Sequence, residues 1–288
     1  MTSTRVIDAV VNGQAVGHYT LPDALLAAHD DVARIAGLAL PAYQQIHFAD
    51  AGCGLVDAAA RGEEPDVAGL LDELRGVVAE ADARRLAELA LVEAREVATT
   101  RLVSAVRATA DETITGHLRP AHDEILEQAR AAVADLDGHP PVPAELINAS
   151  AKIRGAYGRL GDLAHRLDLV RRARSTIIGI TGQTATHDVN GLFSGFANPL
   201  VFWGGQPPPA MARIPAPVDP IPRLAWLVGD GAAGEPWLPT IAEQDAAWEA
   251  STYGERTRQL AQGALNAQAI GARGSFPVGR DHASVLGS

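Results

Sequence analysis

The chain has 288 residues, a formal net charge of -11 and a single cysteine, Cys53. Such an acidic chain lacks the positive field that draws proteins to nucleic-acid phosphates, and one cysteine provides neither an intramolecular disulfide nor a thiolate zinc site. Hydrophobic residues make up 47% of the chain but aromatic residues only 5%, and alanine, the best helix former, supplies much of the difference. No apolar run approaches the roughly 18 residues of a membrane span. The composition therefore predicts a mainly α-helical protein without direct nucleic-acid or membrane binding.

The order of residue types divides the chain into four regions: 1–64, 65–175, 176–239 and 240–288. In the first region, valines and isoleucines flank Asn12 and Gly13, a dipeptide typical of tight hairpin turns, so we expect a small β-hairpin over residues 5–19. A threonine cap at Thr20 and a proline in the first turn predict a helix over residues 20–35. Asp8 stands where a signal peptide would be apolar, and we expect no targeting segment.

The second region, residues 65–175, is predicted to be a long antiparallel helical hairpin resembling a coiled coil. Residues 65–136 contain no strong helix breaker except Pro120, which should kink one helix of about 100 Å. The proline-rich segment 138–143 turns the chain. In the returning helix, two apolar series repeat every seven residues and predict a seam against the outgoing helix; they are Leu146, Ile153, Leu160 and Leu167, and Ala149, Ala156, Leu163 and Val170.

The returning helix is too short to cover the first half of the outgoing helix. Between Val67 and Val103 an apolar face has no cover from neighbouring sequence, and an uncovered stripe of this length is an association site. We expect a second copy of the chain to cover part of it. The interaction candidates on this face are Val67, Leu70, Leu71, Leu74, Val77 and Val78.

The third region, residues 176–239, is predicted to be an extended segment rich in proline and glycine that begins with a short strand over 176–181. Its aromatic residues distinguish it from a disordered linker and are expected to dock on a surface; these further interaction candidates are Phe193, Phe196, Phe202 and Trp203. Residues 223–228 are expected to form a helical turn. In the fourth region, Thr240 and Glu243 match a capping box that opens a helix containing Trp248. A further helix over 255–270 and a tail follow.

No motif in the sequence predicts catalytic, cofactor-binding or metal-binding residues, so we expect no enzyme activity and no cofactor. The pairs His29-Asp30 and His122-Asp123 superficially resemble the metal-binding pair of helical HD-type phosphohydrolases, but no ordered set of further ligands accompanies them. The glycine-rich residues 179–184 lack the lysine of a phosphate-binding loop.

Residues 118–124 (LRPAHDE) and 236–248 (PWLPTIAEQDAAW) resemble uncharacterised proteins of actinobacterial phages and prophages. The resemblance implies a role in the virion or in its assembly, with no catalytic residues to transfer. The first hypothesis is a structural component of a phage head, connector or tail that associates with itself or with other virion proteins. An acidic helical scaffolding or chaperone-like protein is the second, and a helical metal-dependent hydrolase the third. The expected location is the virion, or the host cytoplasm during assembly.

Overall fold

The computed structural model describes residues 2–41, 53, 57, 60–62, 64, 66–186, 188, 191–206, 214–229, 234–251, 254, 255, 259 and 262. Within these residues the protein is helical and contains no strands, which confirms the mainly α fold class. The chain divides into two compact units, one made of Met1–Asn12 and Leu21–Ala110 and the other of Gly13–Thr20 and Asp111–Ser288. The predicted helix over 255–270 lies mostly outside the described residues.

The N-terminal segment forms a helix, α1 (Thr2–Ala15), and the predicted β-hairpin over 5–19 is wrong. The buried side chains of Ile7 and Val10 follow helical spacing, because three residues separate positions on one helix face. Gly13 lies inside the helix, where an added Cβ would come 2.2 Å from the hydroxyl oxygen of Tyr19. The left-handed residue that ends the helix is Gly17, with a φ of 79°. Gly13 therefore provides close packing and not a turn.

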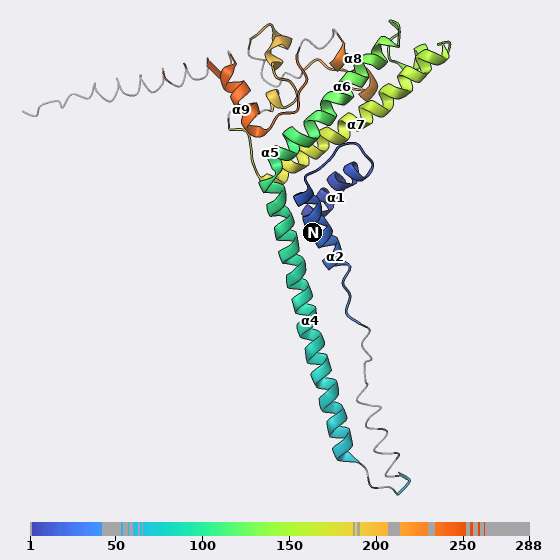
Figure 1. Ribbon diagram of the computed structural model, residues 1–288, viewed down its shortest axis with the longest axis vertical. Helices are drawn as coiled ribbons and strands as arrows, with labels where there is room; N and C mark the ends of the chain where they lie inside the picture. Colours follow the sequence, from blue (N-terminus) through green and yellow to red (C-terminus); the bar gives the residue numbers. More distant parts are fainter. Residues whose placement is uncertain are drawn as a thin grey trace, which may run out of the picture. The chain divides into compact units, whose positions relative to one another are not determined.

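The first unit is built on α2 (Asp23–Ala36) and on α4 (Val67–Ala108). The helix predicted over 20–35 is present, but it begins at Asp23 after Pro22, and the predicted cap at Thr20 is wrong. Helix α4 has 42 residues and a length of about 63 Å. Asp66 caps its start, because one carboxylate oxygen accepts a hydrogen bond of 2.8 Å from the Gly69 N–H. Helix α2 packs against α4, as Figure 1 shows.

The predicted single helix over residues 65–136 is interrupted. After α4 the backbone departs from helical angles at Thr109 (φ −107°, ψ 8°). The chain continues through α5 (Ala110–Glu112), a π-helical turn η1 (Thr113–Leu118) and α6 (Arg119–Ala134). Proline has no N–H and its ring clashes with the carbonyl four residues back, so the wider turn just before Pro120 accommodates it. The Arg119 N–H bonds the Ile114 carbonyl, five residues back, as a π-turn requires.

The second unit contains the predicted helical hairpin, formed by α6 and α7 (Ala151–Thr181) and joined through the short 3-10 turn η2 (Pro143–Leu146). The two helices pack side by side (Figure 1). The predicted seam is buried; its members within α7 are Ile153, Ala156, Leu160, Leu163, Leu167 and Val170. The predicted strand over 176–181 is wrong. Helix α7 continues to Thr181 because the seven-residue series continues to buried Ile177.

The remaining elements of the second unit pack on the hairpin or on one another. Helix α8 (Pro220–Val228) contacts both α6 and α7, and it extends the helical turn expected over 223–228. The 3-10 turns η3 (Leu192–Ser194) and η4 (Pro199–Trp203) precede α8. Helix α9 (Ile241–Ala250) packs on η3 and begins with the predicted capping box of Thr240 and Glu243. The region predicted to be extended therefore forms short helices with a small core of their own.

Candidate interaction surface

Helix α4 has one side that is occupied within its own unit. Arg84 donates a hydrogen bond of 2.7 Å from Nη1 to the carbonyl of Pro41, and Arg95 donates one of 3.1 Å from Nη2 to the carbonyl of Leu38. Nearer the carboxyl end of α4, Ala98 is buried and lines a cavity of about 460 Å³ between α2 and α4. These contacts show which side of α4 faces the rest of the first unit.

The opposite side of α4 exposes large apolar side chains along most of its length. The exposed fractions of these side chains are 53% for Val67, 48% for Leu71, 51% for Val78, 67% for Leu86, 58% for Leu89, 52% for Val92 and 44% for Val97. At 100° per residue, Leu71 and Val78 lie about 160° and 180° around the helix from Ala87, whose side chain is half-buried. Val67, Leu71, Val78 and Leu89 therefore lie on a second face, away from the side that contacts α2 and residues 38–41. Val92 borders a cavity that residues 38–40 also line, and Val97 lines the cavity between α2 and α4.

We call the straight row along this second face the α4 stripe. Its eight members follow one another at alternating steps of four and three residues, and all are exposed; they are Leu71, Arg75, Val78, Asp82, Arg85, Leu89, Val92 and Glu96. This alternation is the spacing of a coiled-coil seam. Leu71 and Glu96 occupy the two ends of the stripe, and the opposite charges of Asp82 and Arg85 adjoin each other at its centre.

The six α4 residues predicted from the sequence divide into three groups. Val67, Leu71 and Val78 are exposed, whereas Leu74 and Val77 are half-buried towards the covered side. The side chain of Leu70 lies outside the described residues. The exposed face is therefore narrower than the predicted one, but it extends further along the helix, to Leu89.

The four predicted aromatic candidates pack inside the second unit. Phe193 is buried with Leu200 and Trp248, and Trp237 donates an indole hydrogen bond of 2.8 Å to the Phe193 carbonyl. Phe196 is buried, and Phe202 and Trp203 are half-buried. The Phe202 ring stacks on Trp226 at 5.6 Å between ring centroids and meets Phe196 edge-on at 5.1 Å. The surface on which these aromatic residues dock is supplied largely by their own chain.

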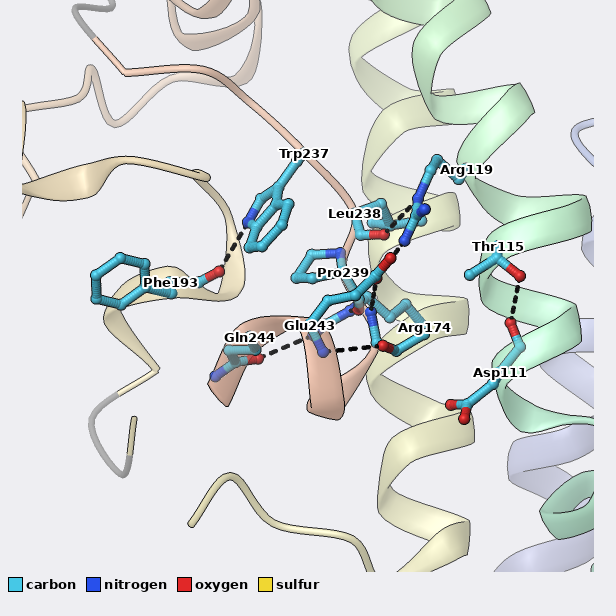
Figure 2. Close-up of polar contacts among 11 residues, drawn as sticks. Asp111, Thr115, Arg119, Arg174, Phe193, Trp237, Leu238, Pro239, Glu243 and Gln244 are labelled. Atoms are coloured by element: carbon cyan, nitrogen blue, oxygen red, sulfur yellow. Dashed lines mark hydrogen bonds and ion pairs between the residues drawn. The ribbon is translucent and has the colours of Figure 1, made fainter. Parts of the chain in front are cut away.

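A buried polar network holds this aromatic cluster and α9 on the hairpin, as Figure 2 shows in part. Arg174 of α7 donates hydrogen bonds of 2.5 Å to the Pro239 carbonyl and 3.0 Å to the amide oxygen of Gln244. The Gln244 amide donates one of 2.9 Å to Asp188. Asp188 also accepts bonds of 2.8 and 2.7 Å from the N–H groups of Leu192 and Phe193. The network is structural, because protein groups supply the partners of its charged atoms.

Burial changes the ionisation of this network. Burial lowers the pKa of Arg174 to about 10, a value at which the guanidinium remains charged at neutral pH. Burial also raises the pKa of Asp188, although its backbone and Gln244 hydrogen bonds oppose the change. Glu243 is half-buried, which by itself raises its pKa, but hydrogen bonds from the Thr240 N–H and from Arg119 outweigh burial, and its pKa is lowered.

No residue pattern in the sequence indicates this network directly, although one pattern indicates it indirectly. Arg174 lies seven residues after Leu167 and therefore continues one of the two apolar series of the hairpin seam. A charged residue at a buried seam position requires a polar partner. The partners, Pro239 and Gln244, follow 65 and 70 residues later, so sequence spacing alone could not identify them.

A second arginine of α7 contrasts with Arg174. The Nη2 atom of Arg171 is buried without a hydrogen-bond partner. Arg171 lines a cavity of about 530 Å³ between α7 and α8, together with Arg223 and apolar side chains such as Leu224. Burial and the nearby Arg223 lower the pKa of Arg171 to about 10. Asp168 lies in the same cavity, but its carboxylate is bonded at 2.7 Å to Arg172.

The histidines of the two His-Asp pairs each contact a carboxylate within the fold. His122 is fully buried and its Nδ1 lies 2.9 Å from a carboxylate oxygen of Asp123, while its Nε2 has no partner. Burial lowers the pKa of His122 below 6.5, against the opposing effect of Asp123. His29 instead approaches Asp8, at 2.9 Å between Nε2 and the carboxylate. Among the residues that the structure describes, no group of three or more His, Cys, Asp or Glu side chains could hold a metal ion.

No protein-family model, curated protein or solved structure matches this chain significantly. Within the described part of the chain, no helix is long and apolar enough to cross a membrane. Any functional proposal must therefore rest on the chain's own surfaces, and the α4 stripe is the clearest of them.

Proposed function

We propose that this chain is a non-catalytic structural component of a phage particle and that it assembles through the exposed face of α4. One observation carries the assembly role: a 42-residue helix that packs on its unit along one side and exposes apolar residues along the other. A row of large apolar side chains exposed to water along one helix is typical of a protein–protein contact. The setting in a phage head, connector or tail rests on the resemblance of residues 118–124 and 236–248 to phage and prophage proteins.

The rest of the molecule is consistent with a passive role. The second unit uses its buried charged residues, Arg174 and Asp188, to fix its own loops, and their charged atoms are bonded to other protein groups. This use of buried charge to fix the chain's own loops supports an architectural role.

A scaffolding role is the second candidate, and the charge pattern of the α4 stripe favours it. Charged residues interrupt the apolar stripe at Arg75, Asp82 and Arg85. Such an interface is weaker than a continuous apolar seam and suits a contact that forms and later dissociates. Both candidates use the same surface, and they differ in whether the chain stays in the finished particle.

The proposal is tested by mass spectrometry of particles purified from cells that make the chain with its neighbouring phage proteins. A structural component is expected in mature particles at a fixed ratio to the major capsid or tail protein. A scaffolding protein is expected in precursor particles only. The Leu71→Asp variant should be absent from both, whereas Val16→Asp, a change at a residue exposed outside α4, should be incorporated normally. Absence of the wild-type chain from all particles contradicts the phage setting.

A further inference from the structure

The α4 stripe carries charges as well as apolar residues, and their order restricts what can pair with it. From its amino end the stripe contains leucine, arginine, valine, aspartate, arginine, leucine, valine and glutamate, at positions 71, 75, 78, 82, 85, 89, 92 and 96. Position 82 is acidic and position 85 is basic, and these two are the innermost members. Over the four central positions, 78, 82, 85 and 89, the order of residue types is the same read towards either end, apart from a reversal of charge. The outer positions do not match in this way, because Leu71 corresponds to Glu96 and Arg75 to Val92.

A parallel pair of α4 helices would place each stripe residue opposite its own copy. Arg75, Asp82, Arg85 and Glu96 would then each face an identical charge. Like charges that face each other across an interface are strongly unfavourable. The stripe therefore disfavours a parallel pair.

An antiparallel pair places opposite charges together in one register. When Asp82 faces Arg85 of the second helix, the two-fold symmetry repeats this ion pair on the other side of the axis. Val78 then faces Leu89 of the second copy, again twice. Towards the ends of the pair, Leu71 faces the carbon stem of Glu96 of the second copy, and Arg75 lays its carbon stem against Val92 of the second copy. The Arg75 guanidinium and the Glu96 carboxylate of the second copy are then about one helical turn apart.

Neighbouring antiparallel registers match less well. A shift of seven residues in one direction places Arg75 opposite Arg85 of the second copy. The same shift in the other direction places Asp82 opposite Val92 and Arg85 opposite Leu89, so each charge loses water without gaining a counterion. A charged pair at a seam position costs stability but fixes register, as a single polar residue does in coiled coils.

We infer that α4 pairs with α4 of a second copy of this chain, antiparallel, about a two-fold axis between Ala83 and Arg84. This inference rests on the proposed function, because it uses the same exposed face and names its partner. The apolar contacts of this register are limited to the Val78–Leu89 layers and the two ends. The pair is therefore a specific but weak dimer that larger assemblies can reinforce.

The experiment is a charge exchange on the full chain, with the dissociation constant measured by sedimentation equilibrium. Asp82→Arg places arginine opposite Arg85 of the second copy, and Arg85→Asp places aspartate opposite Asp82. Each change alone should weaken the dimer by about tenfold or more. The double variant restores both ion pairs with their signs exchanged and should return to within about threefold of wild type. The control Glu80→Arg reverses a charge about 160° around α4 from Asp82 and should change the constant less than about twofold.

A cross-linking measurement fixes the direction of the helices. In a Cys53→Ser background, Val78→Cys and Leu89→Cys variants of different mass are mixed and oxidised. The antiparallel register predicts a disulfide between the two different variants, because positions 78 and 89 face each other. Disulfides between identical variants overturn the antiparallel arrangement.

The outcomes separate this inference from the proposed function. If the Asp82→Arg/Arg85→Asp double variant stays dissociated, or if the wild-type chain is monomeric at 100 times the concentration used in assembly tests, the antiparallel self-pairing is overturned. If Leu71→Asp nevertheless prevents incorporation into particles, the α4 face remains the assembly surface with a different partner. If Leu71→Asp has no effect on either measurement, the proposed assembly surface itself is wrong.

Discussion

Helix α4 and helix α7 are long helices with apolar residues at steps of three and four, yet they use those residues differently. In α7 the apolar series is buried against α6, and its central Leu160 has no exposed surface. In α4, Leu71 and Val78 of the stripe each expose about half of their surface to water. The period of an apolar pattern therefore predicts a helix face that packs against something, but it does not predict whether the same chain or another molecule covers that face.

The largest expected effect is on the free energy of unfolding, which should respond differently to a charge placed on each of these two faces. Leu160→Asp places an unpaired carboxylate in the α6–α7 seam and should lower the free energy of unfolding of the second unit by about 4 kcal/mol or more. Leu71→Asp changes an exposed residue of α4 and should alter stability by about 0.5 kcal/mol or less. Urea unfolding followed by circular dichroism measures both. Similar losses for the two variants would show that the α4 stripe is part of a core.

A smaller effect compares the two arginines on α7. Arg174→Met removes the donor to Pro239 and Gln244 and leaves buried acceptors without partners, so unfolding should become easier by about 2–4 kcal/mol. Arg171→Met keeps a similar length and removes a guanidinium whose Nη2 atom has no partner, so stability should stay the same or increase. Thermal unfolding of both variants provides the measurement. A loss at Arg171 as large as at Arg174 would indicate that its charge supports the fold.

A pH dependence follows from His122 in the hairpin. Its folded-state pKa lies below 6.5 because burial disfavours the charged imidazolium. The unfolded chain therefore binds the proton more readily, and the stability that His122 provides above pH 6.5 is lost as pH falls from 6.5 towards the folded-state pKa. Replacing it by His122→Gln should flatten stability over this range, measured by urea unfolding at several pH values. A variant with the same pH dependence as wild type would assign the effect to other groups.

The smallest effect concerns an exposed ion-pair group at the turn of the hairpin. Asp135 accepts from Arg159 at 2.6 Å and from Lys152 at 3.1 Å, and all three side chains are exposed. Exposed ion pairs contribute little, so Asp135→Asn should cost about 1 kcal/mol or less. The loss should shrink in 1 M salt, where screening is strong. A larger loss that salt does not change would show a structural role for this carboxylate.

The sequence predicted the hairpin seam and the open face of α4 because both depend on local periodicity. The series from Ile153 to Val170 follows directly from seven-residue spacing, and the missing cover of α4 follows from the shorter returning helix. The end of α7 was missed because the β-branched residues Ile177, Ile178 and Ile180 favour strands in isolation. Packing on the seam overrides that preference.

The remaining errors have the same physical origin. The Asn12-Gly13 dipeptide indicated a turn, but the contact between Gly13 and Tyr19 requires a residue without a Cβ inside a helix. The Arg174 network joins groups far apart in the sequence, and their hydrogen bonds exist only in the folded unit. Local patterns thus identify helices and seams, whereas buried polar contacts depend on tertiary packing.

The apolar face of α7 packs against α6 of the same chain, and we propose that the apolar face of α4 packs against a second chain. Sedimentation velocity of the wild-type protein and of a Leu71→Asp/Val78→Asp variant over a wide range of concentrations tests it most directly. Pairing through the α4 stripe predicts that the wild-type sedimentation coefficient rises with concentration. The double variant should stay monomeric and keep an unchanged far-ultraviolet circular dichroism spectrum. A double variant that self-associates as the wild type does would contradict the claim.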